Sequence, residues 1–418
     1  MREMKDSGIE WIGQIPKDWD VVPHKRVMHK VKKICEQYSG EDIISLTMNG
    51  VIKRDLTAGG KMPTSFDGYQ YVKPNDLLLC LFDIDVTPRC VGVVKDYGVT
   101  SPAYSRFVMH DGYYNAYYDY LLRAIDDDKV FVHLSKNLRS SLTESDFGAI
   151  KTCVPSLAEQ KRIVTFLDAQ CAEIDAVLEK TRASIEEYKK LKQAVITQAV
   201  TKGIRGDRPM KNSSIEWIGD IPAEWSVVPF SKFARVSANL VNPSDYQDYL
   251  QVSPENIEKD SGKLLPCKTV SEVGVESWNH FFHKGQILYS KIRPKLNKVC
   301  IAPFDGLCSA DMYPIDTDNI SKFVVYTILS NDFNQQVAMI TENRVKMPKI
   351  NQKELSKIIV VLPADRMEQQ EIVDYLDGEC GKIDALAAKK QQYLTEIENY
   401  KKSLIYEYVT GKREVHPL

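Results

Sequence analysis

Residues 9–23 read IEWIGQIPKDWDVVP, and residues 215–229 read IEWIGDIPAEWSVVP. Eleven of the fifteen positions are identical at an offset of 206 residues, and four of the chain's five tryptophans lie in these two copies. Large aromatic side chains around a Gly and a Pro are typical of a local packing motif at the start of a domain. The duplication is more informative than the motif, because an internal repeat determines the architecture of a chain.

A second segment is also duplicated. PSLAEQKRIVTFLDAQCAEIDAVLEK begins at residue 155 and PADRMEQQEIVDYLDGECGKIDALAAK at residue 363, and from their Glu-Gln pairs onward the copies are offset by 209 residues. Ser156 and Glu159 have the spacing of a capping box, and Asp365 and Glu368 give a similar signal for the start of a helix. The sequence therefore predicts two tandem halves, each running from the Trp motif through a variable stretch to a helix.

Apolar residues then recur in alternating steps of three and four through about four heptads in each copy. A helix of about 40 residues spans about 60 Å, so a pair of long helices is favoured over one helix of an ordinary bundle core. We predict that helices 159–202 and 368–411 pack antiparallel and end at Gly203 and Gly411. The predicted interface residues are Ile174, Leu178, Ile185, Tyr188, Val195, Ile383, Leu394, Ile397 and Leu404.

The variable regions, residues 24–154 and 230–362, barely resemble each other. KPNDLLLCLF (73–82) and HKGQILYSKI (283–292) nevertheless share a turn followed by a buried strand, which predicts mixed α+β domains of similar topology with different surfaces. The basic stretch PHKRVMHKVKK (23–33) is either part of such a surface or a solvated helix face.

The second variable region contains the run FFHKGQILYSKIRPKLNKVC (281–300), which holds five Lys or Arg residues, no acidic residue and interleaved aromatic residues. The run suits phosphate neutralisation with base-edge readout by arginine, although a strand edge guarded by lysine would also explain it. Pro294 predicts extended backbone at Arg293. The candidate DNA-binding residues are Lys284, Lys291, Arg293, Lys295, Lys298, Arg344, Lys346 and Lys349 here, and the more dispersed Arg89, Arg106, Arg139, Lys53 and Arg54 in the first region.

Composition narrows the function classes. The formal net charge is −2, so any nucleic-acid contact depends on local basic surfaces. No apolar run reaches the ~20 residues of a membrane span, the N-terminus lacks a signal-peptide core, and nine cysteines without a C-x-x-C pair predict a reducing cytoplasm and no zinc site. Phosphate-loop, dinucleotide, H-E-x-x-H and Pro-Pro motifs are absent from the sequence, and His280 with His283 is more simply a surface pair than a metal site.

The W-I-G-x-I-P-x-x-W opening and the P-x-L-x-E-Q-x-x-I segment, each present twice from end to end, resemble the specificity subunits of type I restriction–modification systems. One departure is the extra residue before Glu368. The resemblance implies an α+β fold in which two mixed α/β target recognition domains are separated by a long antiparallel two-helix coiled coil, with an internal pseudo-twofold repeat. Its parts would be recognition domains at 1–154 and 207–362 and conserved helical spacers at 155–206 and 363–418.

The same resemblance implies that each recognition domain reads one half of a bipartite double-stranded DNA target, while the paired helices set the spacer. Methylation subunits with S-adenosylmethionine and motor–nuclease restriction subunits with ATP and magnesium would dock on this chain, which would itself bind no cofactor or metal and catalyse nothing. The alternative is a two-headed coiled-coil adaptor that binds proteins. A recognition module of a fused restriction enzyme is disfavoured, because methylase motifs are missing.

Overall fold

Two long helices form where the heptads predict them. Helix α4 comprises Leu157–Lys202 and helix α10 comprises Arg366–Val409. Gly203 and Gly411 follow the helix ends with φ angles of 76° and 71°, the left-handed backbone that favours glycine and ends a helix. The predicted stop signals are therefore confirmed.

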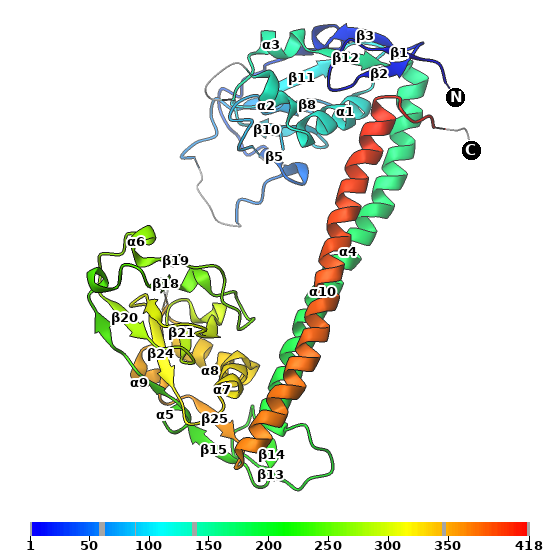
Figure 1. The fold of residues 1–418 in the computed structure, drawn as a ribbon. Coiled ribbons are helices and arrows are strands. Elements are labelled where there is room, and N and C mark those ends of the chain that lie inside the picture. Colours follow the sequence, from blue (N-terminus) through cyan, green and yellow to red (C-terminus); the bar gives the residue numbers. More distant parts are fainter. Residues whose placement is uncertain (1, 58–62, 88, 136–139, 345–347, 416–418) are drawn as a thin grey trace. The chain divides into compact units, whose positions relative to one another are not determined.

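The structure is a computed structural model that describes residues 2–57, 63–87, 89–135, 140–344 and 348–415 (Figure 1). The chain divides into two units, Met1–Thr181 with Tyr393–Leu418 and Arg182–Gln392. Each unit holds one mixed α/β domain, the first half of one long helix and the last half of the other. Domain 1 here means the domain of the first unit, and domain 2 that of the second.

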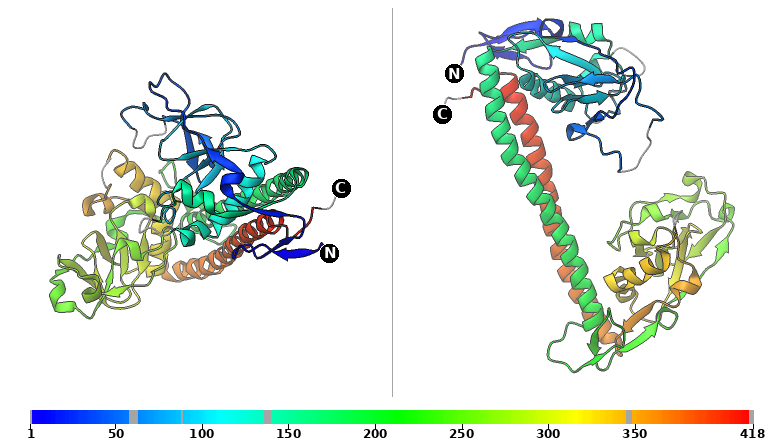
Figure 2. Two further views of the ribbon diagram at one scale, coloured as in Figure 1. Left: turned by 90° about the horizontal axis from the view of Figure 1, so that it is seen from above. Right: turned by 180° about the vertical axis from the view of Figure 1, so that it is seen from behind.

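The two helices run antiparallel, side by side in both views of Figure 2. In the first unit Lys401 Nζ contacts Asp175 at 2.6 Å, and in the second Lys192 Nζ contacts Asp384 at 2.8 Å. Numbering rises along α4 as it falls along α10, and the two pairs are copies of each other at an offset of 209. The predicted interface residues are all buried or half-buried: Ile174, Leu178, Ile185, Tyr188, Val195, Ile383, Leu394, Ile397 and Leu404.

The predicted capping box at the start of α4 is only half formed. Ser156 Oγ accepts the backbone N–H of Glu159 at 3.3 Å, but the Glu159 carboxylate accepts the indole Nε1–H of Trp19 at 3.0 Å instead of returning to the cap. The second copy repeats this contact, since Trp225 Nε1 donates to Glu368 at 2.9 Å. Both indoles are buried, so the duplicated Trp motif and the duplicated helix start are two sides of one contact.

An arginine completes each of these contacts. Arg2 forms an ion pair with Glu159, and Arg208, 206 residues later, forms one with Glu368. The guanidinium of Arg2 also lies 5.8 Å from the centre of the Trp19 ring, as Arg208 lies 5.5 Å from that of Trp225. The repeat therefore begins before the Trp motif.

Each domain core contains side chains from both long helices. In the first unit Leu167 of α4 and Leu404 of α10 belong to one buried apolar cluster. In the second unit Val200 of α4 and Leu376 of α10 do the same. Each domain is thus completed by the start of its own helix and by the end of the helix from the other half of the chain.

Domain 1 is built on a four-stranded antiparallel sheet in the order β4-β11-β8-β9, beside the strand pairs β7-β10, β5-β6, β3-β12 and β1-β2. Its elements are β1 (Met4–Asp6), β2 (Gln14–Pro16), β3 (Asp20–Pro23), η1 (His24–Arg26), β4 (Met28–Lys30), β5 (Ile44–Thr47), β6 (Gly50–Lys53), β7 (Gln70–Val72), β8 (Leu77–Leu79), β9 (Val91–Val93), β10 (Gly98–Thr100), β11 (Ser105–Met109), α1 (Asn115–Asp127), α2 (Val130–Leu134), α3 (Glu144–Ala149) and β12 (Lys151–Val154).

Domain 2 repeats this plan with the sheet β16-β24-β21-β22, a five-stranded sheet β17-β20-β23-β18-β19 and the pairs β15-β25 and β13-β14. Its elements are β13 (Met210–Asn212), β14 (Asp220–Pro222), β15 (Ser226–Pro229), α5 (Phe230–Phe233), β16 (Arg235–Val236), β17 (Leu240–Val241), η2 (Pro243–Tyr246), β18 (Leu250–Val252), η3 (Pro254–Asn256), β19 (Lys268–Thr269), α6 (Val270–Val273), β20 (Asn279–Phe282), β21 (Ile287–Ser290), η4 (Pro294–Leu296), β22 (Val299–Ile301), β23 (Gly306–Cys308), β24 (Met312–Asp316), α7 (Ser321–Leu329), α8 (Asn331–Thr341), α9 (Gln352–Leu355) and β25 (Ile359–Leu362).

The two domains share their strand order. The sheet β4-β11-β8-β9 corresponds to β16-β24-β21-β22, and the pair β3-β12 corresponds to β15-β25. The α+β class, the internal repeat, the two mixed domains and the antiparallel helix pair are therefore confirmed.

Candidate nucleic-acid interface

The basic run of domain 2 extends from the end of β20 through the buried strand β21 to the start of β22, and Lys291, Arg293, Lys295 and Lys298 lie in the loop between β21 and β22. Tyr289 and Phe282 point into the core and are 1% and 0% exposed, so these aromatic residues of the run do not contribute to its surface. The cationic residues lie nearer the surface. Lys291 and Lys298 are half-buried, while Lys284, Arg293 and Lys295 are exposed.

Arg293 does not have the extended backbone that Pro294 predicts. Its φ and ψ are 45° and 52°, in the left-handed region. Its N–H donates to the carbonyl of Pro348 at 2.7 Å, and its own carbonyl accepts from Leu296 N at 2.8 Å. These bonds hold the chain reversal and override the usual preference before proline. The prediction was therefore wrong, and Arg293 is held in a conformation that costs about 1–3 kcal/mol.

A second basic segment, which precedes α9, lies against this loop. Ile350 N donates to the carbonyl of Lys291 at 2.9 Å, and Ile292 forms an antiparallel bridge with Lys349. The structure therefore brings candidates from two distant parts of the sequence together. Lys349 is exposed beside the loop.

Some of these candidates are engaged within the domain. Arg344 forms an ion pair with Glu354 at 2.5 Å, and this hydrogen bond raises the pKa of the guanidinium. Lys291 and Lys298 each donate from Nζ to a backbone carbonyl, at 2.5 and 2.6 Å. Lys346 lies outside the described residues. Among the residues that the structure describes, no side-chain hydrogen bond or ion pair is made by Lys284, Arg293, Lys295 or Lys349.

In domain 1, Arg106 is not a surface residue. Its Nε contacts Asp76 at 2.6 Å, its Nη1 donates to the Tyr71 carbonyl at 3.1 Å, and its side chain is 8% exposed. Breaking such a buried pair by removing one partner typically costs about 3–5 kcal/mol. Arg106 therefore holds the turn before β8, and we remove it from the candidate DNA-binding residues.

Arg89 lines a polar cavity of about 580 Å³ between the β5–β6 hairpin and helices α1 and α4. Arg89 Nη2 lies 3.9 Å from the Asp119 carboxylate, and Arg123 Nε lies 3.1 Å from it. Burial raises the pKa of Asp119, against the effect of the two guanidinium groups. Lys95 and Arg123 also line this cavity, and neither was predicted. Arg123 follows Asp119 by four residues, a spacing that is typical of a solvated helix face and does not indicate a cavity.

The other candidates of the first region differ in position. Lys53 lines the same cavity and forms an ion pair with Asp42 at 2.6 Å, which raises the pKa of the ammonium group. Arg54 is half-buried next to it. Arg139 lies outside the described residues. Lys53 and Arg89 thus share one site, whereas Arg106 does not belong to it.

Two aromatic clusters, one in each domain, were also missed. In domain 2 each ring contacts another at centroid distances of 5.0–5.9 Å, in the set Tyr246, Tyr249, Phe281 and His283. In domain 1 a similar cluster comprises Tyr38, Phe66 and Tyr69. The alternation of β20, with Phe282 inside and Phe281 half-exposed, was the signal that could have revealed the first cluster.

The described residues contain no group of three or more His, Cys, Asp or Glu side chains placed to hold a metal ion. All nine cysteines are free thiols. None of the helices in the described ranges has the length and apolar content needed to cross a membrane.

Residues 231–398 match the family model described as the type I restriction modification DNA specificity domain. The specificity subunit of the type I restriction enzyme EcoDI from Escherichia coli is 34% identical over 290 residues, which are 65% of this chain and 64% of that protein. The chain thus covers less than two thirds of this relative. A putative type I restriction enzyme specificity subunit from Methanocaldococcus jannaschii is 24% identical over 441 residues, covering 97% of this chain and 96% of that protein.

A solved structure with a similar fold comes from work on complex assembly and conformational transition of the type I restriction–modification system. It has a TM-score of 0.70 and 14% sequence identity, and the comparison covers 96% of this chain and 99% of that one. The predicted resemblance is therefore confirmed: residues 231–398 match the type I restriction modification DNA specificity domain, and the chain resembles type I restriction specificity subunits in sequence and has the fold of a solved structure from such a system.

Proposed function

We propose that this chain is the DNA-recognition subunit of a type I restriction–modification complex, in which each domain reads one half of a bipartite target. The observation that carries the proposal is the contrast between scaffold and surface. The Trp19–Glu159 contact recurs as Trp225–Glu368, whereas the exposed charges of the two domains occupy different places. A duplicated frame with divergent faces suits a target with two different halves.

The helix pair would set the spacer between the half-sites. Helix α4 has 46 residues, so it is about 69 Å long. One turn of B-DNA is about 34–36 Å, so a rod of this length is comparable with two turns.

The chain would bind other subunits and catalyse nothing itself. Methylation subunits carrying S-adenosylmethionine, and restriction subunits using ATP and magnesium, would dock on the duplicated helical regions in the cytoplasm. This chain would contribute DNA specificity without a cofactor or metal of its own. The predicted boundaries at residues 154, 206 and 362 would separate the reading domains from these docking regions.

Within domain 2, Arg293 and Lys295 would have different roles. An arginine can bind guanine through two hydrogen bonds that supply about 1–3 kcal/mol of discrimination, whereas a lysine on a phosphate reads no sequence. Arg293→Asn, which retains a residue that tolerates left-handed backbone, should relax preference at one position of one half-site. Lys295→Gln should weaken binding to all sequences and lower the salt slope by about one unit.

The assembled methylase should be titrated with duplex DNA at several salt concentrations. Unchanged affinity and salt slope in both variants would remove this loop from the interface. Arg235→Gln, on the four-stranded sheet of the same domain, serves as a surface control.

The modular function is tested by replacing residues 230–362 with the corresponding region of a relative. Sequencing of methylated DNA should show one new half-site, while the other half-site stays the same. Loss of both half-sites in a correctly folded chimera would contradict independent readout. Failure of the assembled wild-type complex to methylate any bipartite motif would favour the alternative, a two-headed adaptor that binds proteins.

A further inference from the structure

One edge of the main sheet of domain 1 is open. In the part of the chain that the structure describes, β4 is the outermost strand of the sheet β4-β11-β8-β9. Val31 N donates to Arg106 O and His110 N donates to Val27 O, each at 2.9 Å. In an antiparallel ladder, successive residues alternate between pointing their N–H and C=O groups toward the neighbouring strand and pointing them away from it. The peptide groups of Met28 and Lys30 therefore face away from β11. Lys30 is exposed, so its peptide group is open to solvent, whereas Met28 is only 2% exposed.

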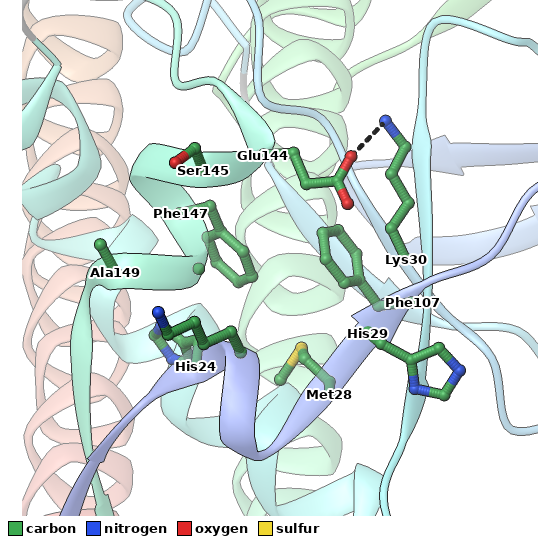
Figure 3. A pocket seen from close by; sticks show the side chains of 11 residues that line it. His24, Met28, His29, Lys30, Phe107, Glu144, Ser145, Phe147 and Ala149 are labelled. Carbon is green, nitrogen blue, oxygen red and sulfur yellow. Dashed lines mark ion pairs between the residues drawn. The ribbon is translucent and has the colours of Figure 1, made fainter.

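A cavity of about 560 Å³ lies between this edge and helix α3 (Figure 3). Met28, Phe107 and Phe147 supply an apolar lining. On the rim, Lys30 Nζ contacts Glu144 at 3.3 Å. A strand laid along β4 would direct every second side chain to one face, so it could place apolar residues over this lining.

The same edge is strongly basic. No acidic residue occurs from Val21 to Cys35. Only residues 24–26 form a helical turn and residues 28–30 form a strand, so the alternative of a solvated helix face is wrong. Six basic or His side chains of this segment are exposed: Lys25, Arg26, His29, Lys30, Lys32 and Lys33.

The fold that the two domains share does not require these basic residues. The corresponding segment of domain 2, residues 230–239, reads FSKFARVSAN, and Lys232 and Arg235 are its only cationic residues. Strand β16 occupies the same outer place in its sheet. The basic edge is therefore a specific property of domain 1.

We propose that the β4 edge and its cavity bind an extended acidic segment of a protein partner by strand addition. Main-chain hydrogen bonds to an exposed sheet edge give affinity in this mode, and alternate side chains give specificity. An outward-facing peptide group beside an apolar cavity favours a polypeptide over duplex DNA, because duplex DNA offers neither a strand backbone to pair with β4 nor apolar side chains to enter the cavity. This site is independent of the proposed DNA interface.

Edge lysines also protect natural sheets from unwanted pairing, and the experiment must separate that role from binding. The probe is a fluorescein-labelled ten-residue peptide of alternating Glu and Val, titrated with the full chain by anisotropy. Lys30→Gln removes one charge and should weaken binding about 2–5-fold. Lys30→Pro also removes the outward N–H, a change that edge strands tolerate, and should weaken it about 2–10-fold further.

The matched control is Arg235→Gln on the corresponding edge of domain 2, which should leave the affinity unchanged. Hydrogen exchange on the wild-type chain gives a readout that needs no variant, because the outward amide of Lys30 should be protected by the peptide and that of Val236, at the corresponding place in domain 2, should not. Absence of saturable binding, equal affinity of the Gln and Pro variants, or displacement of the peptide by a 12-base-pair duplex would overturn the proposal.

Discussion

Domains 1 and 2 make the same contacts with the long helices, but they differ around Arg89 of domain 1 and the corresponding residue of domain 2. Tyr120 Oη donates to Asp168 of α4 at 2.7 Å, and Tyr326 Oη donates to Asp377 of α10 at 2.6 Å. The residue before each of these tyrosines differs, however: the half-buried Asp119 of domain 1 corresponds to Val325 in domain 2. Contacts with the repeated helices are therefore constrained, while the interior next to the loops is free to change polarity.

Arg89 and its counterpart give a second instance of this change. Arg89 lies beside the Asp119 carboxylate and lines the same cavity as Arg123. At the corresponding place in domain 2, the side-chain amide of Asn297 donates to the Leu329 carbonyl at 3.4 Å. An arginine–carboxylate contact in one domain thus corresponds to an amide–carbonyl contact in the other. Loops at these sites can diverge without loss of the shared fold, because that fold is anchored at the long helices.

The largest expected effect comes from lengthening the part that both halves share. Seven residues inserted after Arg182 and seven after the equivalent Gln391 keep the heptad phase of both helices. They add about 10.5 Å, which corresponds to about three base pairs at 3.4 Å each. Sequencing of methylated DNA should show a wider spacer between unchanged half-sites.

The control is insertion into α4 alone. The apolar residues of α4 would then no longer face those of α10 along the whole pair, and the helices should not form a stable pair. An unchanged spacer with altered half-sites in the double insertion would break the idea that the helices act as a ruler.

The next effect tests whether the two Trp–Glu contacts are energetically equivalent. Trp19→Phe and Trp225→Phe each remove a buried hydrogen bond to a carboxylate, which should cost about 1–3 kcal/mol, and the smaller ring adds a packing loss. Chemical unfolding followed by circular dichroism should give similar losses for the two variants. Trp217→Phe, at a side chain that is 46% exposed, should stay within about 0.5 kcal/mol. A large loss in one half only would show that the two Trp–Glu contacts, although alike in sequence and geometry, contribute differently to stability.

The helices and the repeat could be predicted from sequence because their signals are local and periodic. The stop at Gly203 and the seam through Leu178 and Ile185 follow from spacing alone. The role of Arg106 could not be predicted, because its partner Asp76 is 30 residues away and the pair exists only once β8 and β11 are side by side. The backbone of Arg293 was mispredicted for the same reason, since the bond to Pro348 outweighs the local effect of Pro294.

The smallest effect concerns one core position at which the domains differ. His24 occupies the place that Phe230 has in domain 2, and it stacks on Phe147 at a centroid distance of 4.7 Å. Burial lowers the pKa of His24 to about 4, below the usual value of about 6.5 in an unfolded chain. Between these values the unfolded state binds more protons, so His24 makes domain 1 lose stability as pH falls from 6.5 to 4.

His24→Phe removes this loss. Relative to the wild type, the variant should gain about 2 kcal/mol in free energy of unfolding between pH 8 and pH 5. The reciprocal Phe230→His should bring the same acid sensitivity to domain 2, because Phe230 is equally buried, against Phe333 at 5.8 Å. Unfolding at the two pH values measures both differences, and other titrating groups cancel because each variant is compared with the wild type. Equal pH dependence of wild type and His24→Phe would mean that His24 is hydrated or protonated in the folded domain, and the two cores would then differ in more than one ring.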